Sequence, residues 1–236
     1  MSKSQNFDLE MFPPFAGFPE IAIEFLRRLK KNNNREWFAK HKTEYEELIK
    51  FPMQCLIASL RIPMAKIMPE IEINPKRNMF RIHRDTRFSK NKSPYKTNVA
   101  AVFHLKGHWQ ESAGYYVHIE PGNIYVGGGV YMPDGHQLKL IRGAIAERQH
   151  DFQSIVTAKV FIKKFGSLEG DKLQRAPLGY KPDHPMIELL KHKSFYTGVE
   201  WKEKKCFSEM FLDNIVGIYK DLVPLIRFLN EALGKK

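Results

Sequence analysis

The sequence predicts an α+β fold in which helices cover a central antiparallel sheet. Apolar residues recur at helical spacing in the first third of the chain and again after Gly135, whereas the middle third is rich in Val, Ile, Tyr and Phe and alternates with a period of two. The connections between the alternating segments are short, which favours antiparallel pairing. Helices, then strands, then helices is the order expected of an α+β protein.

Length and composition set the domain prediction. The chain has 236 residues, enough to bury roughly 70% of its unfolded surface in one core. No internal repeat, low-complexity tract or change of composition marks an independent domain. We therefore predict a single domain over residues 1–236.

Proline and asparagine mark the predicted N-terminal helices. Pro19 can occupy the first turn of one helix, Asn34 can cap the next, and Pro52 can open a third. Pro63 is expected to interrupt or kink that third helix. The first third of the chain is therefore predicted to be helical.

The middle and the end of the chain complete the prediction. Four strands are predicted at residues 79–88, 99–105, 114–120 and 123–131. Helical spacing then returns, and the last helix is predicted from about Phe207 to Leu233, with a break near Pro224. The strands form the sheet, and the N-terminal and C-terminal helices cover it.

Net charge and the lack of targeting signals bear on the binding partners and the cellular location of the protein. The net charge of +12 and the pI of about 9.6 favour polyanionic partners, although a generally basic soluble protein explains them equally well. The start of the chain lacks a signal-peptide pattern, no apolar run approaches the roughly 18 residues of a membrane span, and Cys55 and Cys206 make no disulfide framework. We expect a cytoplasmic protein with no membrane association and infer no obligate protein partner.

The segment RIHRDTRFSKNKSPYKTN, residues 81–98, concentrates positive charge. As a strand it places Phe80, Ile82 and Phe88 on one face. The other face carries Arg81, His83, Asp85 and Arg87, and Arg84 alone breaks the pattern. Guanidinium groups bind phosphate or carboxylate well, so the segment predicts an anion site. The alternative is structural, with Asp85 holding Arg84 or Arg87 in a network that stabilises the sheet.

A hairpin over residues 114–130 supplies a second set of polar residues. A two-residue turn at Pro121-Gly122 places one polar face on the hairpin, made of Tyr116, His118, Glu120 and Tyr125 beside Gly127 and Gly129. The run Gly127–Gly129 suits close approach of a ligand, but a bulge or close packing explains it at least as well. His118 and Glu120, like His83 and Asp85, suggest an acid–base pair. We favour hydrogen-bonded histidines over a metal site.

The basic segment also resembles a known family. Residues Arg81, Arg84-Asp85, Arg87-Phe88, Lys92, Pro94-Tyr95-Lys96 and Asn98 together resemble the signature of domain of unknown function 2461, a mainly bacterial family. The HIEPG and GGG stretches and the chain length agree with this resemblance. It implies one soluble domain of unassigned function and carries no catalytic residue or cofactor.

Three functional hypotheses follow from these patterns. The first is a binding module for an anionic small molecule, with nucleic acid as an alternative ligand. The second is a His-dependent or metal-assisted hydrolase or transferase acting on a phosphorylated substrate, and the third is a purely structural signature. The candidate ligand-binding residues are Arg81, Arg84, Arg87, Lys92, Tyr95, Lys96, Tyr116, Gly127, Gly128 and Gly129. The candidate catalytic residues are His118, Glu120 and Asp85.

Overall fold

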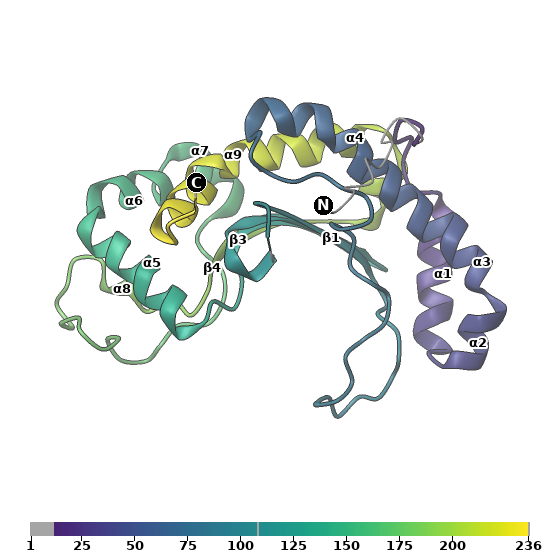
Figure 1. The fold of residues 1–236 in the computed structure, drawn as a ribbon, viewed down its shortest axis with the longest axis horizontal. Helices are drawn as coiled ribbons and strands as arrows, with labels where there is room; N and C mark the ends of the chain where they lie inside the picture. The colour runs from purple at the N-terminus through teal and green to yellow at the C-terminus, as the bar shows by residue number, and fades with distance from the viewer. Residues whose placement is uncertain (1–11, 108, 236) are drawn as a thin grey trace, which may run out of the picture. The chain divides into compact units, whose positions relative to one another are not determined.

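Four strands form one antiparallel sheet in the order β1-β2-β3-β4 in the computed structural model, which describes residues 12–107 and 109–235 (Figure 1). The strands are β1 (Val99–His104), β2 (Gly114–Glu120), β3 (Asn123–Val130) and β4 (Phe195–Trp201). Helices from the N-terminal and C-terminal parts of the chain flank the sheet, so the predicted α+β class is confirmed.

Helices and short helical turns account for the remaining named elements. Before the sheet lie α1 (Glu20–Lys31), α2 (Arg35–Lys40), α3 (Lys42–Tyr45), the π-helical turn η2 (Glu46–Lys50) and α4 (Phe51–Ile67). The 3₁₀ turn η3 (Trp109–Glu111) joins β1 to β2. After β3 come α5 (Gly135–Glu147), α6 (Gln149–Val156), α7 (Lys159–Phe165) and α8 (Ile187–Leu190). The 3₁₀ turn η4 (Glu203–Phe207) and α9 (Met210–Ala232) follow β4.

Contacts between residues divide the chain into two compact units. Unit 1 contains the chain up to Val102 together with Tyr116–Tyr125 and Glu200–Val216. Unit 2 contains Phe103–Tyr115, Val126–Val199 and the chain from Gly217 onward. Every strand of the sheet therefore has residues in both units. The single-domain assignment stays a prediction.

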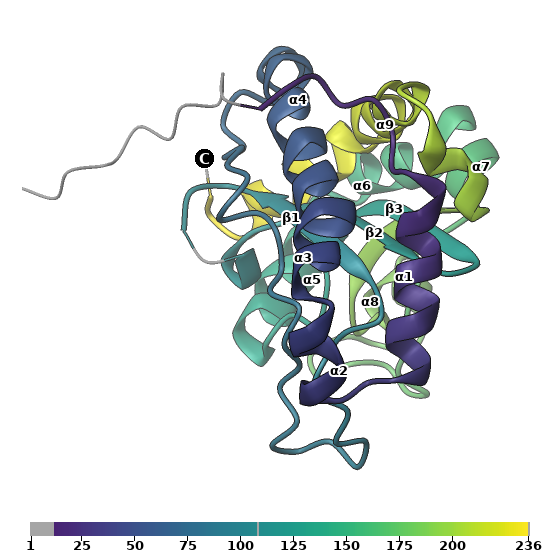
Figure 2. The same ribbon diagram turned by 90° about the vertical axis from the view of Figure 1, so that its right-hand side faces the viewer.

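An aromatic core holds the helices of unit 1 together. α1 lies beside α2 and α3 in both views (Figure 1 and Figure 2). Its residue Phe25 is fully buried, and the ring centre lies 5.8 Å from that of Trp37 and 6.4 Å from that of Tyr45. Asn34 caps α2 as predicted, because its side chain accepts a hydrogen bond from the Trp37 amide at 2.9 Å.

Helix α4 is continuous with the helical turns before it. Pro52 has no N–H to donate to the carbonyl of Leu48, and the π-type turn η2 lies at this point, where the Phe51 amide donates to Glu46. The continuous stretch Lys42–Ile67 meets the length and composition of a membrane span, although no such span was expected from the sequence. The core helix of a soluble protein meets the same test, and Leu56, Ile57 and Leu60 here are fully buried.

In unit 2, the C-terminal helix α9 packs against residues of the sheet, and α5 is hydrogen-bonded to the end of α8. Tyr115 and Phe103 of the sheet pack against Tyr219 of α9, with ring centres 4.6 Å and 5.9 Å apart. Arg142 of α5 donates to the carbonyl oxygens of Leu190 and His192, which ties α5 to the segment that follows α8.

Two internal prolines leave their helices unbroken. α4 continues through Pro63 to Ile67, so this proline does not interrupt the helix. α9 runs from Met210 to Ala232 without the break predicted near Pro224. Both helices have buried apolar residues close to the proline, Leu60 and Met64 in α4 and Leu222 and Leu225 in α9. Tertiary packing of this kind can outweigh the hydrogen bond that a proline removes.

One predicted strand was wrong and one strand was missed. Residues 79–88 form no strand: Met79 makes an isolated bridge to Ala101 of β1, and His83 makes one to Tyr95, outside the sheet. The fourth strand is β4 (Phe195–Trp201), which lies among the late helices and pairs over a long sequence distance with β3. The other three predicted strands, 99–105, 114–120 and 123–131, agree with β1, β2 and β3 to within one residue.

Candidate functional site

The basic segment forms a two-chain arm, which we define as residues 81–96. Its two chains pair at their start, where the Arg84 amide donates to Pro94 at 2.9 Å and the Lys96 amide donates to Ile82 at 2.8 Å. His83 and Tyr95 form an antiparallel bridge between these contacts. Figure 1 and Figure 2 show the arm as the blue-green loop that extends away from the strands and helices of unit 1.

Tyr95 anchors the arm to the N-terminal helices. Its amide donates to the side-chain oxygen of Asn33 at 3.0 Å, and the Asn33 amide group donates back to the Tyr95 carbonyl at 2.9 Å. The Tyr95 ring is buried and stacks on Phe38 with the ring centres 4.1 Å apart. Tyr95, predicted to bind ligand, therefore lies in the core of unit 1.

Four further candidate residues stabilise the conformation of the arm tip: Arg84 and Lys92, and the pair Asp85 and Arg87. Arg84 is half-buried and donates to the Ser93 carbonyl at 3.1 Å and to the Ser89 hydroxyl at 3.4 Å. Lys92 donates to the Thr86 carbonyl at 3.0 Å. Their donors satisfy backbone and side-chain groups inside the loop.

Asp85 and Arg87 form the remaining contact of the tip. The Arg87 guanidinium donates to both carboxylate oxygens of Asp85, at 3.0 Å and 2.7 Å, and the Arg87 amide donates to Asp85 as well. These hydrogen bonds lower the pKa of Asp85 to about 2. The pairing of Asp85 with Arg87 agrees with the structural alternative, but the pair lies on an exposed loop and not in a network that stabilises the sheet.

Two cations at the base of the arm have no such partners. Arg81 is exposed and Lys96 is half-buried, and within residues 12–107 and 109–235 neither side chain has a hydrogen bond or an ion pair. The Lys96 ammonium lies 4.9 Å from the centre of the Phe80 ring. Burial first, and repulsion by Arg81 second, lower the pKa of Lys96.

A row of rings continues from Phe80 across the sheet. The centre of the Phe80 ring lies 6.3 Å from that of Tyr116, and Tyr116 lies 5.6 Å from the imidazole of His118. His118 stacks on Tyr125 at 5.9 Å with an angle of 22° between the rings. This cross-strand pair agrees with the predicted register around the turn at Pro121-Gly122.

His118 lies at the far end of the row beside two carboxylates. Its Nε2 atom is buried, has no hydrogen-bond partner, and lies 3.8 Å from Oε1 of Glu120. Burial lowers the pKa of His118, and the negative charges of Glu120 and Glu200 oppose this shift. Glu200 was not predicted, because it belongs to the missed strand β4.

These contacts define one continuous surface of unit 1, the cation–aromatic face. It consists of Arg81, Lys96, Phe80, Tyr116, His118 and Tyr125. Of the sequence candidates, the structure brings Arg81, Lys96, Tyr116 and His118 onto this face and Glu120 to its edge. Phe80, predicted as the apolar back of a strand, contributes its ring to the face.

The glycine run has a packing role at two of its positions. A Cβ atom at Gly128 would lie 2.8 Å from the Gly114 carbonyl oxygen and 3.1 Å from Ile226. Gly129 has a φ of +138°, and a Cβ atom there would overlap the backbone of Phe195 and Tyr196. The protein's own atoms fill this space, so Gly128 and Gly129 are not included in the candidate site, and a ligand-binding role of Gly127 stays a prediction.

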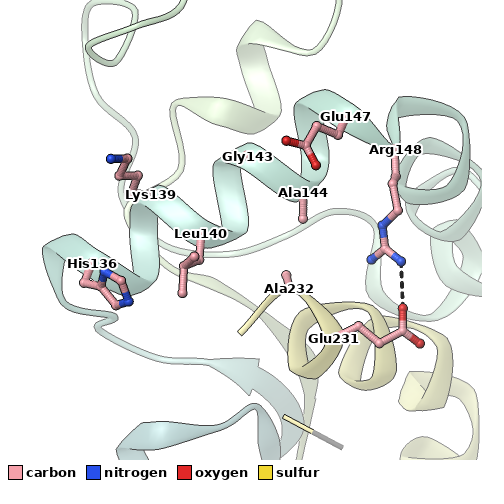
Figure 3. A pocket seen from close by; sticks show the side chains of 9 residues that line it. All are labelled: His136, Lys139, Leu140, Gly143, Ala144, Glu147, Arg148, Glu231 and Ala232. Carbon is pink, nitrogen blue, oxygen red and sulfur yellow. Dashed lines mark hydrogen bonds and ion pairs between the residues drawn. The ribbon is translucent and has the colours of Figure 1, made fainter. Parts of the chain in front are cut away.

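Neither metal-ligand clusters nor pockets identify another site for the predicted residues. No group of three or more His, Cys, Asp or Glu side chains in the described part of the chain is placed to hold a metal ion. Unit 2 contains a pocket of about 450 Å³ between α5 and the end of α9 (Figure 3). Leu140 and Ala144 line it, and an ion pair of 2.7 Å joins Arg148 to Glu231 at one end. None of the predicted site residues lines this pocket.

Comparison with known proteins assigns the family. A family model described as a conserved hypothetical protein, DUF2461, matches residues 21–228. The chain belongs to the DUF2461 family. The matched region includes the whole arm and the cation–aromatic face of this DUF2461 protein. Neither the curated proteins nor the solved structures yield a match.

Proposed function

We propose that this DUF2461 protein binds a phosphate-bearing ligand on the cation–aromatic face. The observation that carries the proposal is the pair Arg81 and Lys96, two neighbouring cations that form no hydrogen bond or ion pair with a carboxylate among the described residues, although Asp85 acts on Arg81 through space. A half-buried ammonium beside a like charge is unfavourable in the free protein. A bound phosphate relieves this repulsion and accepts charge-assisted hydrogen bonds from both groups.

The rings beside the cations indicate the rest of the ligand. Phe80 and Tyr116 are half-exposed, and Lys96 lies over the Phe80 ring at 4.9 Å. A planar aromatic group can stack on such rings while its phosphate reaches the cations. The ligand class supported best is therefore a nucleotide-like molecule, with a phosphate and an aromatic base.

Calorimetric titration tests this proposal with three probes: adenosine 5′-monophosphate, adenosine and inorganic phosphate. We expect the nucleotide to bind more tightly than either part, and its affinity to fall as salt is added. Lys96→Met and Arg81→Met should each weaken nucleotide binding by about tenfold, the value of one charge-assisted hydrogen bond.

Matched controls come from α4 in the same unit. Lys66 and Arg61 are exposed and have no partner in the described chain, so Lys66→Met and Arg61→Met remove the same charges at a distance from the face. These variants should bind like the wild type. Equal loss in the face variants and the α4 variants would reduce the effect to net charge and contradict the proposal.

A His-dependent hydrolase or transferase is the second candidate. It is favoured by the 3.8 Å separation of His118 and Glu120 and by the lowered pKa of His118, which favours a neutral imidazole able to accept a proton. It ranks second because Nε2 has no access to solvent in this conformation. A screen of phosphoesters with and without Mg²⁺, Mn²⁺ or Zn²⁺ tests it. Activity that His118→Asn abolishes would support the enzyme, and identical wild-type and variant profiles would reject it.

A further inference from the structure

The tip of the arm exposes a large aromatic residue. Phe88 was predicted to lie on the apolar back of a strand, yet its side chain is 95% exposed. Single exposed apolar residues are common on protein surfaces, so the exposure of Phe88 becomes informative through its setting in an ordered, cationic loop. The guanidinium of Arg87 lies near the ring, with its Cζ atom 5.8 Å from the ring centre.

The loop around Phe88 is held in place by its own side chains. The contacts of Asp85 with Arg87, of Arg84 with Ser89 and Ser93, and of Lys92 with Thr86 close the loop on both sides of the ring. The backbone adds a bond from the Ser89 amide to Thr86 at 3.4 Å. Residues of the sequence signature thus fix a loop that carries the exposed side chain of Phe88. A surface ordered before binding loses less entropy when a partner arrives.

Positive charge is concentrated in the residues next to Phe88 in the sequence. Arg87, Lys90 and Lys92 are exposed beside Phe88, and Asp85 is the one acid among residues 84–93. An exposed ring with cationic side chains nearby in the same loop suits a partner that offers planar rings and negative charge at short, regular spacing. Single-stranded nucleic acid has both features, because unpaired bases stack on aromatic side chains and every nucleotide carries a phosphate.

We propose that the arm tip binds single-stranded nucleic acid, with Phe88 stacked on an unpaired base and Arg87, Lys90 and Lys92 beside the flanking phosphates. This surface is separate from the cation–aromatic face in its residues, and the inference does not depend on nucleotide binding there. An anionic membrane is the weaker partner, because Phe88 is the only large apolar side chain of residues 84–93 and a stable membrane contact needs several.

Fluorescence anisotropy with labelled twelve-nucleotide poly-dT and poly-U tests the proposal on the full chain. Phe88→Ala should weaken binding of both oligonucleotides by about tenfold, as expected for one lost base–aromatic stack. Phe88→Leu keeps an apolar side chain but no ring, so it should also weaken binding. Phe88→Trp should restore it, and its tryptophan emission should be quenched on binding.

Leu178 provides the matched control. It is another fully exposed large apolar residue in a loop, and it lies in unit 2. Leu178→Ala should bind oligonucleotides like the wild type. Because Phe88 and Leu178 are both exposed, neither change should alter the melting temperature, which separates loss of binding from loss of folding.

The outcomes are distinguishable from those of the nucleotide titration. Oligonucleotide binding that depends on Phe88, with mononucleotide binding that depends on Lys96 and Arg81 but not on Phe88, supports both proposals. Oligonucleotide binding unchanged in Phe88→Ala overturns the arm proposal and leaves nucleotide binding unaffected. Tighter binding of a duplex than of the single strand also overturns it, as does Phe88-dependent binding to phosphatidylserine vesicles without any binding to oligonucleotides.

Discussion

The side chain of Asn33 satisfies both backbone groups of Tyr95, accepting from its amide at 3.0 Å and donating to its carbonyl at 2.9 Å. One amide side chain in the turn between α1 and α2 thereby replaces a strand partner for a residue 62 positions later in the chain. The contact explains why the arm leaves the sheet at a defined place. It also makes Asn33 a target for testing the arm independently of any ligand.

Asn33→Ala should release the arm from the N-terminal helices. The change leaves the amide and carbonyl of buried Tyr95 without partners, which costs about 2 kcal/mol in the free energy of unfolding. Hydrogen exchange should accelerate in residues 81–96. The neighbouring Asn34→Ala removes the α2 cap and should cost about 1 kcal/mol without altering exchange in the arm. Equal exchange in both variants would contradict the anchoring role.

The stability of the protein should depend on pH through His118. Burial lowers its pKa below the usual value near 6.5, so the unfolded chain takes up the proton first as the pH falls. The free energy of unfolding should therefore be fully present above pH 6.5 and decrease below it. His192, whose pKa burial also lowers, contributes in the same direction. In urea titrations at about pH 7.5 and 5.5, His118→Gln should show a smaller decrease than the wild type. An equal decrease in the free energy of unfolding in both proteins would show that groups other than His118 cause the pH dependence.

Asp85→Asn should loosen the arm tip without unfolding the protein. The carboxylate with a pKa of about 2 stays ionised in the folded state across ordinary pH, and its contacts with Arg87 lie on an exposed loop. Exposed ion pairs contribute little to global stability, so the melting temperature should stay unchanged. Amide exchange at residues 85–93 should increase, and the wild type should lose its protection in the same region only as the pH falls through the folded pKa. A large drop in melting temperature would assign the pair a role in the core.

Alanine substitutions at Gly122 and Gly129 should distinguish the cost of backbone strain from the cost of steric overlap. Gly122 has a φ of +89°, and no atom lies within 4 Å of the position that a Cβ atom would take, so Gly122→Ala should cost about 1 kcal/mol. Gly129 combines a φ of +138° with overlap onto the backbone of Phe195 and Tyr196, so Gly129→Ala should cost several times more or prevent folding. Urea denaturation of the two variants measures the difference. Similar values would show that β3 and β4 can separate locally to accept the methyl group.

Local patterns predicted the elements whose partners lie nearby in sequence. The hairpin of β2 and β3 followed from its two-residue turn and alternation, and the cap at Asn34 followed from residue type. Strand β4 was missed because Gly198 interrupts its pattern and its partner lies about 70 residues earlier. Residues 79–88 were misassigned because alternation cannot reveal that the chain turns on itself after Ile82.

The site was predictable in composition but not in its internal pairing. Sequence identified the cations and the ring of Tyr116 but placed Phe80 on the apolar back of a strand. Arg81, Lys96, Tyr116 and His118 do share a face. It did not reveal that Arg84, Arg87 and Lys92 donate to groups inside the arm, because such bonds depend on the loop conformation. Exposure of Phe88 was hidden for the same reason, since a strand and a loop of this sequence present different side chains to solvent.

The division of every strand between two contact units has a consequence for synthesis on the ribosome. α1–α4 and the arm emerge early, yet the segment Glu200–Val216 that completes their unit emerges about a hundred residues later. During most of translation, α1 and α4 therefore lack the packing partners that Glu200–Val216 supplies. A chain that ends before residue 216 lacks part of both units.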